Sequence, residues 1–310
     1  MACDPRPPLL ILCGPTAAGK TALALELARQ FPLEIISADS RQVYRGMDIG
    51  TAKATAAEQA SVRHHLLDVV DPDQEFSVAQ FASLAHAALA DILDRQRRPA
   101  LVGGTGLYIR ILTEGLVDAP GADPDLRQEL LARERSEGPG SLYRLLQARD
   151  PETARRLFPR DVVRIVRALE VAQLTGQPLS ALQRRHGFSD RPYRTLKLAV
   201  ALEREELYRR IDRRVEAMFA AGLLEETRLL LARGYCPDSN ALRTIGYRES
   251  VACLRGEATV DETIAAIQLA TRRYAKRQLT WLRGDKSIIW VDYSRESARI
   301  LSLIENFYAA

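Results

Sequence analysis

A glycine-rich loop near the N-terminus constrains the fold of this chain more than any other feature. The pattern G-x4-G-K-[ST] is matched by Gly14, Pro15, Thr16, Ala17, Ala18, Gly19, Lys20 and Thr21. An apolar run at 9–13 precedes this loop and a helical pattern at 20–30 follows it, which is the context that the pattern requires. In such a loop, backbone N–H groups and the helix N-terminus face an anion, and the lysine adds a positive charge. The loop therefore predicts a phosphate site in an α/β protein.

The alternative is a glycine-rich turn that only connects a strand to a helix. Lysine usage argues against it, because the chain has five lysines beside 39 arginines and one of the five is Lys20. The hydroxyl of Thr21 would be available to a magnesium ion.

A second glycine loop, Gly103-Gly104-Thr105-Gly106, follows the apolar run 99–102. A nucleoside triphosphatase usually carries a magnesium-holding aspartate at the end of such a strand. Here glycines and a threonine stand in its place. The site is expected to bind a phosphate chain, but it lacks the aspartate that enzymes transferring a phosphoryl group usually have here.

Strand and helix patterns alternate along most of the chain. Strands are predicted at 9–13, 34–37, 99–103, 196–202 and 288–291, and helices at 20–30, 77–97, 104–114, 204–233 and 259–283. This alternation predicts an α/β fold, a parallel sheet wrapped by helices. Residues 120–195 interrupt it with short, arginine-rich helical patterns. We therefore expect an inserted α-helical subdomain at 120–195 and a catalytic core formed by 1–119 and 196–310.

Composition sets the expected location. No apolar stretch reaches 18 residues and no basic segment precedes Leu9, so neither a membrane span nor a signal peptide is expected. Cysteines at 3, 13, 236 and 253 lack C-x-x-C spacing. They suit a reducing compartment and predict a cytoplasmic protein without a zinc site.

Positive charge is concentrated away from the first loop. Residues 1–119 carry 11 basic and 14 acidic side chains, whereas residues 120–200 carry 15 and 10, and residues 243–286 carry 9 and 5. Such segments suggest a polyanionic partner, RNA or DNA, although solvated helix faces would give the same counts.

Asp39 follows the second predicted strand. Because ligands bind at the carboxyl ends of parallel strands, Asp39 should lie on the same edge as both glycine loops. Its carboxylate would hold magnesium-bound water or accept a proton from a nucleophile. The alternative is an ordinary turn or helix-capping aspartate.

Several segments, taken in order, resemble the tRNA isopentenyltransferase family in its bacterial form. They are the first loop, the stretch Asp39-Ser40-Arg41-Gln42-Val43-Tyr44-Arg45-Gly46-Met47-Asp48-Ile49-Gly50-Thr51-Ala52-Lys53, the second loop with Leu107 and Tyr108, and residues 63–68, 244–249 and 273–283. The resemblance covers about residues 9 to 291.

The resemblance implies transfer of a dimethylallyl group from dimethylallyl diphosphate to the exocyclic amine of the adenosine just 3′ of the anticodon. It implies that residues 16–21 cradle the diphosphate, that Thr21 holds Mg²⁺, that Thr105 bonds the bridging oxygen and that Asp39 accepts the amine proton. Arg210 and Arg214, spaced i, i+4 on one helix face, would neutralise the leaving diphosphate, unless that face is only solvated.

The resemblance also implies the tRNA anticodon stem-loop as partner, and we expect a monomer. The residues that would contact tRNA are Asp39, Ser40, Arg41, Gln42, Thr105, Arg127, Arg160, Asp161, Val162, Val163, Arg164, Arg243, Thr244, Ile245, Gly246, Tyr247, Arg248, Lys276, Arg277, Gln278, Leu279, Thr280, Trp281, Leu282 and Arg283. For Trp281 a place in the core is the preferred interpretation.

Three other functions share some of these features. An ATP-dependent kinase predicts a strand-end carboxylate and no long basic insertion. An enzyme that prenylates free adenine nucleotides needs no subdomain for gripping tRNA. An RNA-binding switch protein needs neither Asp39 nor Thr105.

Overall fold

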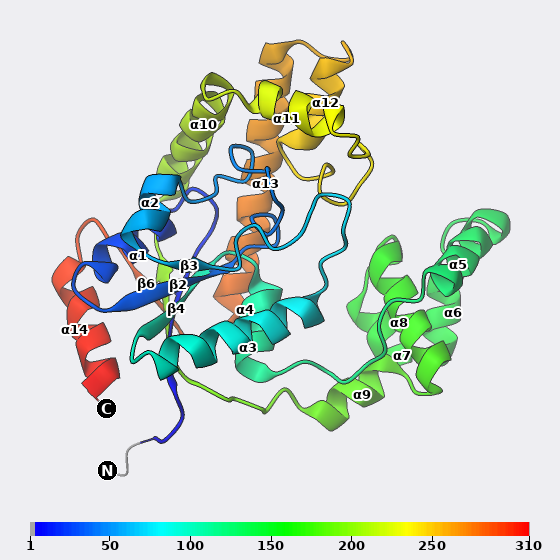
Figure 1. Cartoon of the computed structure of the whole chain (residues 1–310). Helices are drawn as coiled ribbons and strands as arrows, with labels where there is room; N and C mark the ends of the chain where they lie inside the picture. Colours follow the sequence, from blue (N-terminus) through cyan, green and yellow to red (C-terminus); the bar gives the residue numbers. More distant parts are fainter. Residues whose placement is uncertain (1–3, 310) are drawn as a thin grey trace. The chain divides into compact units, whose positions relative to one another are not determined.

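A six-stranded sheet forms the centre of the computed structural model, which describes residues 4–309 (Figure 1). All its strands are parallel, in the order β3-β2-β4-β1-β5-β6. The strands are β1 (Pro8–Cys13), β2 (Leu33–Ala38), β3 (His64–His65), β4 (Arg98–Gly103), β5 (Arg194–Val200) and β6 (Ile288–Val291). The predicted α/β fold with a parallel sheet is confirmed, and β3 is an additional short edge strand.

Helices cover both faces of the sheet because its central strands are apolar on both faces. Leu9, Ile11 and Cys13 of β1 pack with residues of α3 (Val78–Asp94) and α4 (Gly106–Glu114). Leu10 and Leu12 pack with residues of α1 (Lys20–Ala28) and α14 (Ser297–Ala309). The alternation of neighbouring residues between two cores is the period of a strand, and it makes the sheet a rigid base for the loops at its edge.

Further helices extend the sheet unit: α2 (Ala56–Ser61), α10 (Arg204–Ala220), α11 (Leu223–Ala232), α12 (Tyr247–Leu254) and α13 (Val260–Gly284). The single helix predicted over 204–233 is wrong. Gly222 between α10 and α11 has φ 98°, a left-handed conformation that ends one helix and starts the next. Figure 1 shows α13 as the long orange helix.

The chain divides into two compact units, one of Met1–Thr113 with Pro192–Ala310 and one of Glu114–Arg191. The second unit begins six residues before the expected 120 and ends four before the expected 195. It is made of α5 (Pro124–Glu137), α6 (Ser141–Arg149), α7 (Pro151–Arg156), α8 (Val162–Thr175) and α9 (Leu179–His186). It has a core of its own, which includes Leu130, Leu142, Leu146, Ile165 and Leu169.

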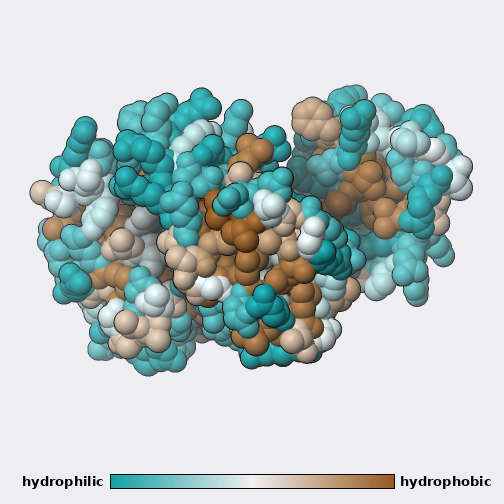
Figure 2. All heavy atoms as spheres, turned by 90° about the horizontal axis from the view of Figure 1, so that it is seen from above, coloured by the Kyte–Doolittle hydropathy of each residue, from teal (hydrophilic) through white to brown (hydrophobic). Residues whose placement is uncertain are grey.

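Hydrophobic residues reach the surface in separate patches. Figure 2 shows these patches in brown among hydrophilic side chains. Within residues 4–309, no helix combines the length and the apolar character needed to cross a membrane.

Candidate active site

Three neighbouring strands bring the two glycine loops and Asp39 together. Gly103, at the end of β4, pairs with Cys13 of β1 and with Ala38 of β2. A methyl group on Gly103 would lie 2.2 Å from the Ala38 carbonyl oxygen, so the close approach of these strands requires glycine. Thr105 N donates to Ala38 O (3.1 Å), and the Thr105 hydroxyl accepts from Ser40 N (3.2 Å). Asp39 therefore lies beside both loops, as its strand-end position predicts.

The first loop wraps one side of a cavity of about 240 Å³. Its polar lining includes Thr16, Lys20, Thr21, Asp39, Glu58 and Arg214. Gly19 precedes α1 with φ 97°, so the loop turns sharply into the helix N-terminus. Lys20 Nζ donates to Pro15 O at 2.8 Å, which folds the side chain back over the loop. The arrangement is that of an anion cradle.

The two cations of this cavity lie in a poorly solvated setting. Burial lowers the pKa of Lys20 to about 8, although the nearby Asp39 carboxylate opposes the change. Burial also lowers the pKa of the Arg214 guanidinium, which Asp39 again opposes. An anion bound here would satisfy both cations, since each has lost part of its hydration.

A second cavity of about 290 Å³ adjoins the first. Thr16, Asp39, Thr51, Ala52 and Arg214 line both. The second cavity also has an apolar part, formed by Val215, Met218, Ile245 and Ile267. A ligand with a charged end and a short apolar chain would therefore find both environments on either side of Asp39.

The structure separates the two arginines of α10. Arg214 lines both cavities, and its Nη1 lies 3.5 Å from the Thr16 hydroxyl. Arg210 lines neither of these cavities, and its Nε donates to Glu206 at 2.8 Å. Arg210 is nevertheless near the first loop, because a methyl group on Gly19 would lie 3.7 Å from Arg210 Nη1. Arg214 is thus the arginine that faces the anion cradle.

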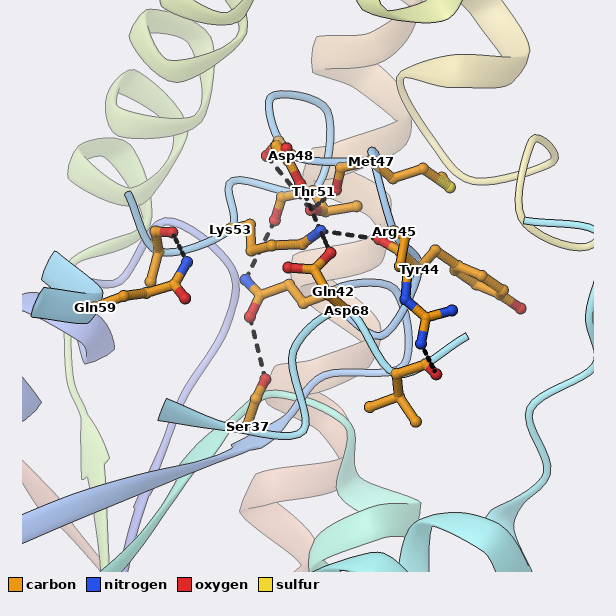
Figure 3. Close-up of polar contacts among 12 residues, drawn as sticks. Ser37, Gln42, Tyr44, Arg45, Met47, Asp48, Thr51, Lys53, Gln59 and Asp68 are labelled. Atoms are coloured by element: carbon orange, nitrogen blue, oxygen red, sulfur yellow. Dashed lines mark hydrogen bonds and ion pairs between the residues drawn. The ribbon is translucent and has the colours of Figure 1, made fainter. Parts of the chain in front are cut away.

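Hydrogen bonds and ion pairs hold the stretch from Asp39 to Lys53 in place. Figure 3 shows Lys53 at its centre, with Nζ 2.8 Å from Tyr44 O, 2.5 Å from Asp48 Oδ1 and 2.6 Å from Asp68 Oδ1. The amide of Gln42 donates to Ala52 O (3.2 Å) and accepts from the Ser37 hydroxyl (3.1 Å). These bonds fix the loop that carries Asp39.

Asp39 itself is oriented by its own turn. Its Oδ1 accepts from Arg41 N at 2.8 Å and from Gln42 N at 3.4 Å. This is the turn-capping contact of the alternative interpretation. It leaves Oδ2 without a partner among the hydrogen bonds described, and Asp39 lines both cavities. The turn contact therefore uses one carboxylate oxygen and leaves the other as an acceptor.

One face of α13 forms a further wall, of which only Gln278 was among the predicted site residues. Ile267, Thr271 and Tyr274 line the second cavity, and Gln278 lines the first. Burial raises the pKa of Tyr274 to about 12, and the nearby Thr105 side chain opposes this change. Residues 267, 271, 274 and 278 are spaced by 3 or 4 residues, so the sequence could have predicted that they share one face of this helix.

The residues expected to contact tRNA divide by exposure. Exposed ones are Arg160, Val163, Arg164, Arg243, Arg248, Lys276, Arg277, Thr280 and Arg283. Half-buried ones are Asp39, Ser40, Arg41, Gln42, Thr105, Arg127, Asp161, Val162, Ile245, Leu279 and Trp281. Buried ones are Thr244, Gly246, Tyr247, Gln278 and Leu282. A methyl group on Gly106 would lie 2.2 Å from the Trp281 ring, in keeping with a core role for Trp281.

Two residues of this set hold internal carboxylates. The Tyr247 hydroxyl donates to Glu226 at 2.6 Å, and Glu226 also accepts from Ile49 N at 2.9 Å. In the second unit, Arg127 donates to the fully buried Glu170 through Nε (2.7 Å) and Nη2 (3.1 Å). In this structure both side chains are committed to packing and ion pairing within the protein.

Together, the parallel sheet brings an anion cradle next to a cavity with an apolar part, and the Asp39 carboxylate lines both. This arrangement suits the transfer of a group from an anionic donor. The family model described as IPP transferase matches residues 42–285. The chain belongs to the IPP transferase family.

Relatives match over nearly the whole chain. A tRNA dimethylallyltransferase from Geobacter metallireducens is 56% identical, covering 97% of both chains. The tRNA dimethylallyltransferase 1 of Syntrophotalea carbinolica is 54% identical, covering 99% of this chain and 98% of its own.

Solved structures share the fold. The tRNA isopentenylpyrophosphate transferase from Bacillus halodurans has a TM-score of 0.71 and 40% identity, with 96% of each chain covered. A eukaryotic dimethylallyltransferase acting on tRNA has a TM-score of 0.83 and 28% identity, covering 98% of this chain and 80% of its own.

Proposed function

We propose that this protein is a tRNA dimethylallyltransferase, which moves a dimethylallyl group from dimethylallyl diphosphate to the exocyclic amine of the adenosine 3′ of the anticodon and releases diphosphate. The observation that carries the proposal is that Asp39 lines both the anion cradle and the second cavity, which has an apolar part. The donor fits this division, because its diphosphate is anionic and its five-carbon chain is apolar. The names of the relatives with 54% and 56% identity point to the same reaction.

Different residues act on the two reactants, the diphosphate of the donor and the amine of the adenine. Lys20, Arg214 and the first loop hold the diphosphate, and Thr105 donates a hydrogen bond to its bridging oxygen as the C–O bond breaks. Asp39 accepts a hydrogen bond, and then the proton, from the adenine amine as the new N–C bond forms. The amine is a poor nucleophile, because its lone pair is delocalised into the ring, so orientation beside Asp39 matters. The adenine must leave its stack to reach this depth.

We propose Mg²⁺ as the cofactor. Thr21 lines the cradle and carries a hydroxyl, and oxygen ligands suit this ion. Among residues 4–309, no group of three or more His, Cys, Asp or Glu side chains is placed to hold a metal. Diphosphate and water oxygens would therefore supply most of the ligands. A bound Mg²⁺ would neutralise charge on the departing diphosphate.

The proposal is tested with radiolabelled dimethylallyl diphosphate, Mg²⁺ and unmodified tRNA. Label should enter the RNA and, after nuclease digestion, lie in the fragment that contains the adenosine 3′ of the anticodon. A tRNA with guanosine at that position is the control and should stay unlabelled. Label in free adenine nucleotides but not in tRNA would instead favour the nucleotide-prenylating alternative.

The pKa of Lys20 predicts proton uptake when the donor binds. In the free protein Lys20 loses its proton near pH 8, and the diphosphate should raise the pKa because it favours the charged form. Donor affinity should therefore fall as the pH rises above about 8, and binding at pH 8 to 9 should take up part of one proton. Calorimetry in buffers of different ionisation enthalpy measures this uptake.

The matched variant for this measurement is Lys20→Arg, because a guanidinium keeps its charge throughout this range. Its donor binding should show no uptake from this position. Equal uptake by Lys20→Arg and the unchanged protein would assign the titration to another group.

We propose that exposed basic residues meet tRNA phosphates. Separate alanine replacements of Arg160, Arg164, Arg248, Lys276 and Arg283 should each lower affinity for all accepted tRNAs. Each should also reduce the slope of log affinity against log salt by about 0.7 to 1. Arg299→Ala is the control, because Arg299 is an exposed arginine of α14 and belongs to none of the segments predicted to contact tRNA. If the slope of log affinity against log salt is unchanged in all five variants, other residues must bind the tRNA phosphates.

Arg127 should behave differently from these five. Its replacement by alanine removes one of the two arginines that hold Glu170, since Arg167 Nη1 also donates to that carboxylate at 2.6 Å. A lower Tm is therefore expected beside any change in tRNA affinity.

A further inference from the structure

Gln278 of α13 lies between the two glycine loops. Its Oε1 accepts from Thr16 N at 2.9 Å, and its Nε2 donates to Gly104 O at 3.0 Å. Only 7% of Gln278 is exposed. A methyl group on Gly104 would lie 2.2 Å from Gln278 Nε2 and 3.0 Å from Gly14 O, so the amide packs directly against Gly104. The amide therefore joins the two loops directly.

The same helix also reaches the next residue of the second loop. Tyr274, one turn before Gln278, lies close enough to Thr105 for that side chain to oppose the rise in the pKa of Tyr274 that burial causes. Thr105 therefore follows Gly104, which is hydrogen-bonded to Gln278, and it lies near Tyr274 on the same face of α13. The Thr16 N–H is taken up by Gln278, so in this structure that amide is not one of the donors that face the cradle.

We propose that Gln278 is a positioning residue, which sets the location of the Thr105 hydroxyl relative to the diphosphate held by the first loop. This role rests on the proposed function and replaces the direct tRNA contact that the resemblance implied for Gln278. The physical reason is geometric. The bridging oxygen is fixed by the first loop, and a donor displaced by about 1 Å loses much of its effect, on the order of 10²-fold in rate.

A double-mutant cycle with Gln278→Ala and Thr105→Ala tests the proposal. Gln278→Ala alone should lower the single-turnover rate by roughly 10-fold to 10²-fold, with tRNA affinity changed by no more than about twofold. Once Thr105 is alanine, there is no hydroxyl left to position. In that background Gln278→Ala should cost less than about twofold, so the two effects should be strongly non-additive.

Gln268→Ala is the matched control, because it also removes a glutamine amide that reaches out from α13. Gln268 Nε2 lies 3.5 Å from Asp212 O on α10, and Gln268 does not line the two cavities of the site. Its rate should stay within about twofold of the unchanged protein. Thermal unfolding of every variant, and its binding of inorganic diphosphate, show that the fold and the cradle persist.

Should Gln278→Ala not fold, Gln278→Glu serves in the same cycle, because its carboxylate keeps an acceptor for Thr16 N and removes the donor to Gly104 O. An equal loss from the Gln278 replacement with and without Thr105 overturns the proposal. A tRNA affinity that falls while the single-turnover rate stays unchanged also overturns it and restores Gln278 as a tRNA contact. Absence of transfer by the unchanged protein would contradict the proposed function instead.

Discussion

Replacing Asp39 with asparagine is expected to slow dimethylallyl transfer by roughly 10²-fold or more, with tRNA bound almost as tightly as before. Asparagine has the shape of aspartate, and its oxygen can still accept from Arg41 N, a bond of 2.8 Å in the structure. It cannot take up the proton that the adenine amine must lose. Single-turnover transfer, with tRNA binding measured separately, distinguishes the two effects.

Asp73→Asn is the control for this variant, because Asp73 is exposed and lines neither cavity of the site. It should react at the rate of the unchanged protein. Single-turnover chemistry at the full rate in Asp39→Asn would exclude Asp39 as the proton acceptor and leave it the role of a turn aspartate.

Arg214→Ala should lower donor affinity and transfer together by a total of roughly 10 to 10²-fold, the scale of a lost hydrogen bond to a charged group. Arg210→Ala on the same helix is the comparison. Arg210 is paired with Glu206 and 41% of its side chain is exposed, so its removal should cost only a few-fold. Binding of inorganic diphosphate to each variant measures the difference without the chemistry. Equal losses would mean that both arginines reach the diphosphate, and a larger loss from Arg210→Ala would reverse the assignment.

The sequence was sufficient to predict most of the sheet and the edge of the sheet at which Asp39 and the two glycine loops meet. Apolar runs that alternate with helical patterns predicted five of the strands, and the rule that ligands lie at strand ends placed Asp39 beside both loops. The edge strand β3 could not be predicted, because it has two residues and exists only through pairing of His64 with Ile35 and of His65 with Ile36. Its sequence has no strand pattern of its own.

Residue roles were harder to predict than positions. Arg210 and Arg214 share a helix face, but the sequence does not show that Glu206, four residues before Arg210, draws that arginine away from the cradle. Gln278 and Tyr247 fall within segments that the resemblance assigned to tRNA contacts, and the structure buries both. Burial depends on which helix packs above a loop, so it follows from tertiary structure and not from a motif.

The most direct test of the central claim is the balance of products in a reaction without ATP. The central claim is that the cradle holds an isoprenoid diphosphate and that the reaction transfers carbon, not phosphorus. With dimethylallyl diphosphate, Mg²⁺ and unmodified tRNA, one diphosphate should be released for each dimethylallyl group found on the adenosine 3′ of the anticodon, and added ATP should remain intact. ATP consumed in proportion to modified adenosine, or an absolute requirement for ATP, would contradict the claim.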